Sequence, residues 1–396
     1  MTSVFLGPGY YTKSNFEARD YAGLNQFPAE GCLVEVSAAS TDVDMSGAVL
    51  DGESDGGVGI YVHDCDDVII KNGVIKGFHH GIRAVNVTRL TILNCVVSDN
   101  HNPINTGWLP DSIEPVEEGF GGGIYLYGVS DSIIEGNHLN NNFNGISLVR
   151  CERNKIAGNN ASYSGNIGIH LLASSHNEID GNRADHCIRY TDRFWCDTAD
   201  SAGILLEEYS HYNKIIGNSL RYSGDGFFIR ANNRHSCNHN YVACNDGSFS
   251  PNNAFEAVFS RFNVFEDNVA DFSNYGFWLG YSRDTAVLRN RIRSNRLDGI
   301  AIEAGRGNRI KQNTIIGNRT GIRLWRLAPP TKNAEENSGT GSYVISNNKI
   351  KDSREWAIVY PDDLEVRLAE NRLENNRQDV LREPAEYANP TVDASE

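Results

Sequence analysis

The stretch GISLVRCERNKIAGN at residues 145–159 decides the fold of this chain. A glycine opens it, apolar residues follow at alternating positions, and an asparagine ends it. Such alternation is typical of a β-strand that buries one of its two faces. Asparagine favours tight turns and tolerates left-handed backbone. The stretch therefore predicts short strands joined by tight corners.

The same pattern recurs along most of the chain. Neighbouring copies most often start 22 or 23 residues apart, and longer intervals contain insertions such as 103–120, 188–200 and 328–341. A fixed period of about 20 to 50 residues is the signature of a solenoid, in which each repeat adds one coil. The copies are GIYVHDC at 59, GIRAVNV at 81, GIYLYGV at 123, GISLVRC at 145, GIHLLAS at 168, GILLEEY at 203, GFFIRAN at 226, AFEAVFS at 254, GFWLGYS at 276, GIAIEAG at 299, GIRLWRL at 321 and AIVYPDD at 357.

Asparagine recurs at one place in most repeats, 14 or 15 residues after the lead residue. Side chains at equivalent corners of stacked coils lie next to each other, so an asparagine there can bond its neighbours above and below. We expect a buried ladder inside one corner of the solenoid. Its members are Asn137, Asn159, Asn182, Asn218, Asn268, Asn290 and Asn313.

The repeat G-I-x-L-x-x-S-x-x-N-x-I-x-x-N resembles that of the right-handed parallel β-helix repeat proteins, the pectate-lyase-like and NosD-like group. The resemblance implies an all-β fold, a single-stranded right-handed parallel β-helix of about 12 or 13 coils with an N-terminal cap. We expect the cap at 1–42, the β-helix at 43–376 and a polar C-terminal tail at 377–396. The fold hosts many unrelated activities, so it does not indicate a function.

Composition narrows the range of partners. The formal net charge of -15 argues against nucleic acid, because affinity for a phosphate backbone rests on clustered Lys and Arg. No stretch approaches the roughly 18 apolar residues of a membrane span. The opening 20 residues lack the pattern of a secretory signal, so we expect a cytoplasmic protein or an exported one whose signal was removed.

The eight cysteines show no metal-binding spacing, and we predict free thiols. Cys187 with Cys196, and Cys237 with Cys244, are close enough in sequence to cross-link in an oxidising compartment. We predict neither a metal site nor a cofactor, except for calcium if the protein is a lyase. The oligomeric state is left open.

Strand alternation places Glu256 on a surface. In the segment AFEAV, Phe255 and Ala257 face the core, so Glu256 faces outward. Reading the outward positions down the coils predicts one strip that is both aromatic and charged. The insertions precede lead residues, so we expect them to wall this strip into a groove. Its members are His170, Glu207, Phe228, Arg230, Glu256, Trp278, Glu303, Arg323 and Trp325.

Such a groove suits an oligo- or polysaccharide, because sugar faces stack on aromatic rings and hydroxyls bond to polar side chains. The leading hypothesis is a glycoside hydrolase or transglycosidase in which Glu256 is the acid and Glu207 or Glu303 its partner. Apolar neighbours raise the pKa of a carboxyl group, as an acid catalyst requires. The predicted substrate-binding residues are His170, Phe228, Arg230, Trp278, Arg323 and Trp325.

Two other functions remain open. A polysaccharide lyase or uronate epimerase would use Arg230 or His170 to take a proton, and a non-catalytic glycan-binding or structural β-helix would have no turnover. The Asp-Pro-His-Asp motif of the alginate epimerases of this fold and the motif series of its polygalacturonases are absent, so no catalytic set is carried over. Simpler roles also exist: Glu256 as an ion pair with Arg230 or Arg261, and Asp225 and Asp298 as turn residues.

Overall fold

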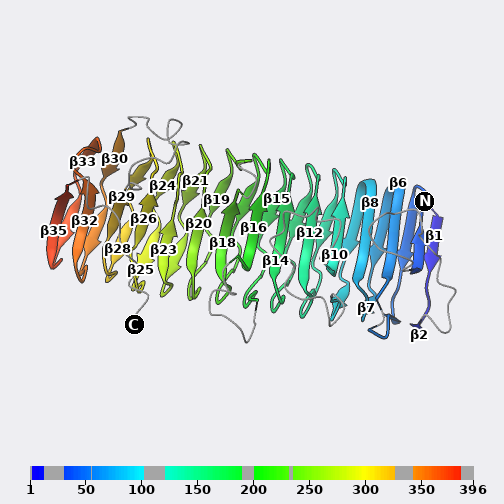
Figure 1. Ribbon diagram of the computed structural model, residues 1–396. Helices are drawn as coiled ribbons and strands as arrows, with labels where there is room; N and C mark the ends of the chain where they lie inside the picture. Colours follow the sequence, from blue (N-terminus) through cyan, green and yellow to red (C-terminus); the bar gives the residue numbers. More distant parts are fainter. Residues whose placement is uncertain are drawn as a thin grey trace.

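The computed structural model describes residues 2–12, 31–54, 56–101, 121–189, 200–231, 235–325 and 342–384. Strands and turns make up these residues, and the strands stack along one axis from the N-terminal to the C-terminal end (Figure 1). Among the described ranges, no helix is long and apolar enough to cross a membrane. The molecule is a parallel solenoid of about 13 turns, which confirms the predicted right-handed β-helix.

The first row of strands contains the repeated GIxLx segments. Each strand pairs in parallel with its equivalent in the next coil, so that Ile146 stacks on Ile169 and Ile169 on Ile204. The row comprises β3 (Cys32–Val36), β6 (Val58–Lys71), β8 (His80–Leu93), β10 (Gly122–Tyr127), β12 (Asn144–Val149), β14 (Ile167–Leu172), β16 (Ala202–Glu207), β18 (Asp225–Arg230), β20 (Asn253–Ala257), β23 (Tyr275–Trp278), β26 (Ile300–Glu303), β29 (Ile322–Trp325), β32 (Trp356–Pro361) and β35 (Gln378–Glu383).

The other two rows close each coil. The second row comprises β1 (Thr2–Phe5), β4 (Thr41–Asp44), the second halves of β6 and β8, β11 (Ile133–Glu135), β13 (Lys155–Ala157), β15 (Glu178–Asp180), β17 (Lys214–Ile216), β19 (Tyr241–Ala243), β21 (Val264–Glu266), β24 (Ala286–Leu288), β27 (Arg309–Lys311), β30 (Tyr343–Ser346) and β33 (Val366–Ala369). The third comprises β2 (Gly9–Thr12), β5 (Ala48–Asp51), β7 (Val74–Lys76), β9 (Val96–Ser98), β22 (Val269–Asp271), β25 (Arg291–Arg293), β28 (Thr314–Ile316), β31 (Lys349–Lys351) and β34 (Arg372–Glu374), with isolated bridges across the central coils.

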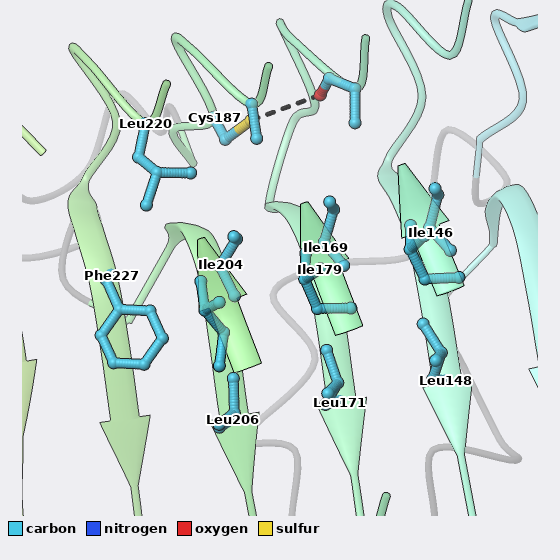
Figure 2. Packing of buried hydrophobic residues seen from close by; sticks show 14 of the residues in the cluster. Ile146, Leu148, Ile169, Leu171, Ile179, Cys187, Ile204, Leu206, Leu220 and Phe227 are labelled. Atoms are coloured by element: carbon cyan, nitrogen blue, oxygen red, sulfur yellow. Dashed lines mark hydrogen bonds between the residues drawn. The ribbon is translucent and has the colours of Figure 1, made fainter. Parts of the chain in front are cut away.

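The core is a column of apolar side chains enclosed by the three rows. Figure 2 shows Ile146, Ile169, Ile204 and Phe227 at equivalent places in consecutive coils, and each is fully buried. The lead residue of each segment also faces this core. A Cβ atom added to Gly168 would lie 2.6 Å from the Ala184 side chain, which explains why glycine leads most segments.

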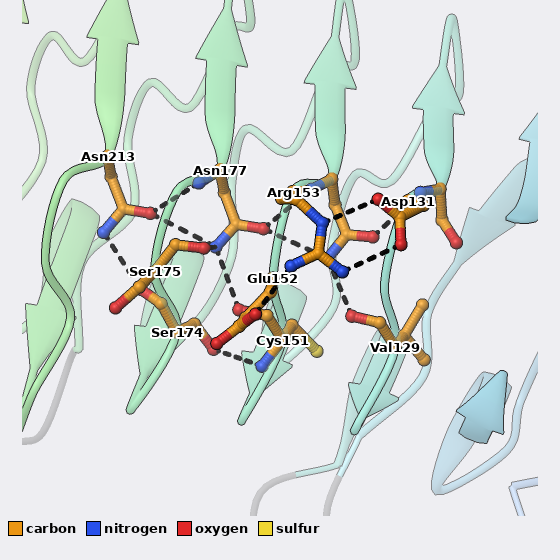
Figure 3. Close-up of polar contacts among 11 residues, drawn as sticks. Val129, Asp131, Cys151, Glu152, Arg153, Ser174, Ser175, Asn177 and Asn213 are labelled. Carbon is orange, nitrogen blue, oxygen red and sulfur yellow. Dashed lines mark hydrogen bonds and ion pairs between the residues drawn. The ribbon is translucent and has the colours of Figure 1, made fainter. Parts of the chain in front are cut away.

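The predicted asparagine ladder is present. The backbone N–H of Asn159 donates to Oδ1 of Asn182 at 2.9 Å, and Nδ2 of Asn182 donates to Oδ1 of Asn218 at 3.1 Å. A second ladder occupies the preceding corner, where Nδ2 of Asn177 donates to Asn213 at 3.2 Å (Figure 3). These bonds satisfy buried polar groups where the chain turns, which regular sheet pairing cannot do.

The sheet extends into both predicted end segments. Strand β3 pairs with β6, and strand β35 pairs with β32. The described cysteines are free thiols, including Cys237 and Cys244, whereas Cys196 lies outside the described residues. The insertions expected to wall the groove lie almost entirely outside them as well.

Candidate functional site

Three columns of side chains point outward from the first row of strands. The third and fifth residues of each segment face outward, as alternation predicts. Because the lead residue faces the core, the residue just before it also faces outward. Asp225 and Asn253 lie in this additional column, and Glu256 lies beside them in the next.

Glu207 lies between His170 and Arg230. Nε2 of His170 is 2.6 Å from Oε2 of Glu207, and Nε of Arg230 donates to Oε1 at 2.8 Å. The three side chains are buried, with exposed fractions of 0, 1 and 7 % for His170, Glu207 and Arg230. Burial opposes ionisation of Glu207, but the hydrogen bond from His170 and the charge of Arg230 outweigh it and lower its pKa. Glu207 is therefore an ionised residue with both oxygens engaged.

The two partners of Glu207, His170 and Arg230, differ in the contacts of their other nitrogen atoms. An ionised carboxylate only accepts hydrogen bonds, so His170 donates through Nε2. Its Nδ1 is buried and, within the described part of the chain, has no hydrogen-bond partner. Nη1 of Arg230 lies 3.6 Å from a carboxylate oxygen of Asp200. The network thus contains one buried nitrogen, Nδ1 of His170, that has no partner among the described residues.

Glu256 faces outward as predicted, with Phe255 and Ala257 buried on either side. Its side chain is partly exposed, and Nδ2 of Asn253 donates a hydrogen bond to Oε2. The close packing around this carboxyl raises its pKa well above the ordinary value, and the charges of Asp225 and Asp200 add to the effect. Glu256 is therefore a partly exposed carboxyl group whose pKa is raised.

Asp225 is fully buried next to Glu256. Its Oδ1 accepts the backbone N–H of Asn253 at 2.9 Å, and the side chain of Asn252 donates to both oxygens at 2.9 and 3.1 Å. Burial raises the pKa of Asp225 to about 7 despite these hydrogen bonds. Two carboxyl groups with raised pKa values therefore meet on neighbouring strands.

Phe228 is 4 % exposed and packs with Ile167, Ala202, Leu205 and Val258. The structure thus places this predicted sugar-binding ring in an apolar layer beside Glu256. Arg230 forms ion pairs with Glu207 at 2.8 Å and with Asp200 at 3.6 Å.

An aromatic group follows on the C-terminal side. Trp278 stands in register with Glu256 and is partly exposed. Its ring centroid lies 5.0 Å from that of Tyr275 and 5.2 Å from that of Trp325, and Trp325 itself is buried. Glu303 is in register with Trp325, one coil before it. Trp278 is therefore the predicted ring that stands both next to Glu256 and open to solvent.

The remaining predicted residues lie close to this aromatic group. Burial raises the pKa of Glu303, which is half-buried. Arg323 has a side chain 20 % exposed, and its Nη2 lies 3.9 Å from Glu383. The predicted strip thus separates into a network around Glu207 and Glu256 and an aromatic group around Trp278.

Sequence reasoning missed Asp225, Asn252, Asn253 and Asp200 as parts of the site. Asp225 was expected to be a turn residue, but it is a buried strand residue that faces Glu256's coil. The available signal was the position of Asp225 directly before the inward-facing lead residue of its repeat, Gly226. Asn253 holds the same position before Ala254 in the next repeat. In the described ranges, no group of three or more His, Cys, Asp and Glu side chains is placed to hold a metal ion.

Comparison with known families agrees with this architecture. A family model described as "Right handed beta helix region" matches residues 39–220 and 113–270, which together span more than half of the chain. The chain belongs to the right-handed β-helix family. A second model, "Periplasmic copper-binding protein (NosD)", matches residues 192–391 of this β-helix protein. Among curated proteins, none matches significantly.

Solved structures share the fold at low identity. A mutant of the periplasmic alginate epimerase AlgG is 12 % identical and superimposes with a TM-score of 0.55, covering 94 % of this chain and 85 % of that one. The Dettilon tailspike protein is 12 % identical, with a TM-score of 0.47 and coverage of 87 % and 61 %. A mannuronan C-5 epimerase A-module from Azotobacter vinelandii is 12 % identical, with a TM-score of 0.41 and coverage of 95 % and 98 %. At these identities, likeness shows the fold alone.

Proposed function

We propose that this β-helix protein is an enzyme that cleaves or transfers a glycosidic bond in an oligo- or polysaccharide, with Glu256 as the general acid. The observation that carries the proposal is a carboxyl group that is partly exposed in register with the partly exposed ring of Trp278, and the raised pKa of this carboxyl supports it. A general acid works best when its pKa lies near the working pH. Glu256 would protonate the glycosidic oxygen as the bond to the sugar breaks.

The surroundings of Glu256 support a sugar substrate. Trp278 is in register with Glu256 and partly exposed, so a sugar ring could stack on it while its linkage oxygen lies at the carboxyl. Arg323, on a strand two coils beyond Trp278, would orient hydroxyl or carboxylate groups. The fold shared with an alginate epimerase supports a polysaccharide as the substrate class.

Glu303 is the better candidate for the second catalytic carboxyl group. Both oxygens of Glu207 are engaged by His170 and Arg230, so its proposed role is to position these two side chains. Glu303 is half-buried with a raised pKa, which strengthens it as a proton acceptor once it is ionised. It would activate the water or hydroxyl that attacks the sugar.

A uronate epimerase or lyase is the second candidate. It is favoured by His170, whose Nδ1 has no partner within the described residues while Glu207 holds Nε2. That arrangement orients an imidazole as a base able to take the proton α to a carboxylate.

The name of the NosD family and that of AlgG both say periplasmic, so we propose that the protein acts after export.

Product analysis on a panel of neutral and uronic-acid glycans tests these roles. New reducing ends without ultraviolet absorbance indicate hydrolysis, and new unsaturated ends that absorb in the ultraviolet indicate elimination. A changed uronate composition at constant chain length, seen by NMR, indicates epimerisation. Binding without any product would leave a glycan-binding protein and overturn the enzymatic proposal.

A further inference from the structure

Asn253 joins two carboxyl groups that stand on adjacent strands. Its backbone N–H donates to Asp225 on β18 at 2.9 Å, and its side-chain Nδ2 donates to Glu256 on its own strand β20. The same side chain is 96 % buried, since its exposed fraction is 4 %. Asp225 therefore bonds the backbone of Asn253, and the side chain of Asn253 bonds Glu256.

One end of the Asn253 amide is left without a partner. Oδ1 is buried and, in the part of the chain that the structure describes, accepts no hydrogen bond. A buried polar atom without a partner costs free energy, so native proteins keep few of them outside functional sites. The atom belongs to the amide that contacts the proposed acid, which indicates a place reserved for a polar group of a ligand.

We propose that Asp225 is a positioning residue that fixes the Glu256 carboxyl through Asn253. The negative charge of Asp225 itself, and not the hydrogen bond from Asn253, favours the protonated form of Glu256. The inference rests on the proposed role of Glu256 as an acid. Asn253 then presents Oδ1 to a substrate hydroxyl beside the bond that Glu256 protonates. This assigns a function to two residues of the column that directly precedes the lead residues.

The charges and hydrogen bonds around Glu256 determine whether each substitution raises or lowers its pKa. Asp225 and Asp200 face it as like charges that favour its protonated form, whereas Arg230 and the hydrogen bond from Asn253 favour its ionised form. Strand β23, on the other side, contributes the uncharged rings of Tyr275 and Trp278. Removing the charge of Asp225 should therefore lower the pKa of Glu256, and removing the Asn253 amide should raise it.

The test follows the carboxyl carbon of Glu256 by NMR in the full-length protein labelled with ¹³C at glutamate carboxyls. The resonance lost in Glu256→Gln identifies the group. We expect its titration midpoint to fall by about half a pH unit or more in Asp225→Asn and to rise in Asn253→Ala. Asp298→Asn is the matched control, because Asp298 is also buried before a lead glycine but pairs with Arg319.

Circular dichroism must show the same fold in all variants, and Asp225→Asn is the conservative change because its amide oxygen can still accept the Asn253 N–H. Unchanged midpoints in both Asp225→Asn and Asn253→Ala would overturn the inference, even if Glu256→Gln abolishes activity. The midpoints are measured without substrate. Absence of glycan turnover would therefore refute the proposed function. The titration midpoints would still show whether Asp225 affects the Glu256 carboxyl.

Discussion

Nε2 of His170 lies 2.6 Å from Oε2 of Glu207, although the two residues are 37 positions apart and belong to neighbouring coils. Arg230 completes the contact from the following coil. A buried polar network of this kind is favourable only while every charge keeps its partner. The network of His170, Glu207 and Arg230 therefore links three consecutive coils beside Glu256.

Glu207→Gln should destabilise the protein by about 3 to 5 kcal/mol at neutral pH, because it removes the nearer and fully buried charge partner of Arg230. Urea denaturation gives the free energy of unfolding. Asp131→Asn is the control, since it removes the exposed ion pair with Arg153 shown in Figure 3, and it should cause no measurable loss. Equal stability of Glu207→Gln and wild type would contradict the buried network.

Acid should remove the stabilisation that Glu207 contributes. Its folded-state pKa is lowered relative to the ordinary value of 4.5, so the stabilisation is fully present above that value and is lost as pH falls through the folded-state pKa. The gap in unfolding free energy between wild type and Glu207→Gln should narrow as pH falls below 4.5. A constant gap down to the acid transition would show that Glu207 is not the titrating group.

Glu256→Gln should lower turnover at least about a hundredfold, since general acid catalysis commonly contributes 10² to 10⁴. The same change should maintain or increase stability at pH 7 and above. A carboxyl whose folded-state pKa is raised binds its proton more tightly when folded, so it costs stability as pH rises past its unfolded value. Wild-type turnover in Glu256→Gln would eliminate the acid mechanism.

Asn182→Ala should cost about 1 to 3 kcal/mol, because it leaves buried ladder groups without partners. Among them are the backbone N–H of Asn159 and the carbonyl of Ile156, which Asn182 bonds at 2.9 and 2.8 Å. Thermal and urea denaturation measure the effect. Asn160→Ala is the matched control, because its half-buried side chain accepts one N–H from Ser162 at 3.2 Å and should matter much less.

Trp278→Ala should raise KM by roughly 2- to 10-fold with a smaller change in kcat, because loss of an aromatic stacking contact commonly costs about 0.5 to 1.5 kcal/mol. Trp278→Phe should restore most of the affinity. Phe272→Ala tests a ring that is 55 % exposed at a corner of the solenoid, and its KM should equal that of wild type. An unaltered KM in Trp278→Ala would place the sugar elsewhere.

The sequence alone was sufficient for the fold and for the direction in which Glu256 points. Both depend on local rules that every coil repeats: alternation buries Ile146 and Ile169, and the corner asparagines bond their equivalents in neighbouring coils. Residues at equivalent positions of a repeat have equivalent surroundings. The sequence repeat therefore predicted the strands, their stacking and the asparagine ladder.

Only the tertiary structure decided which polar residues meet. The contact of His170 with Glu207 joins different columns of neighbouring coils across an insertion, so no spacing in the chain indicates it. Asp225 accepts a hydrogen bond from Asn253 of the next coil. The contact forms because the lead residue of each segment faces the core, so the side chain before it faces outward. Proton affinity follows from this packing, since the burial and the neighbouring charges that raise the pKa of Glu256 come from residues far apart in sequence.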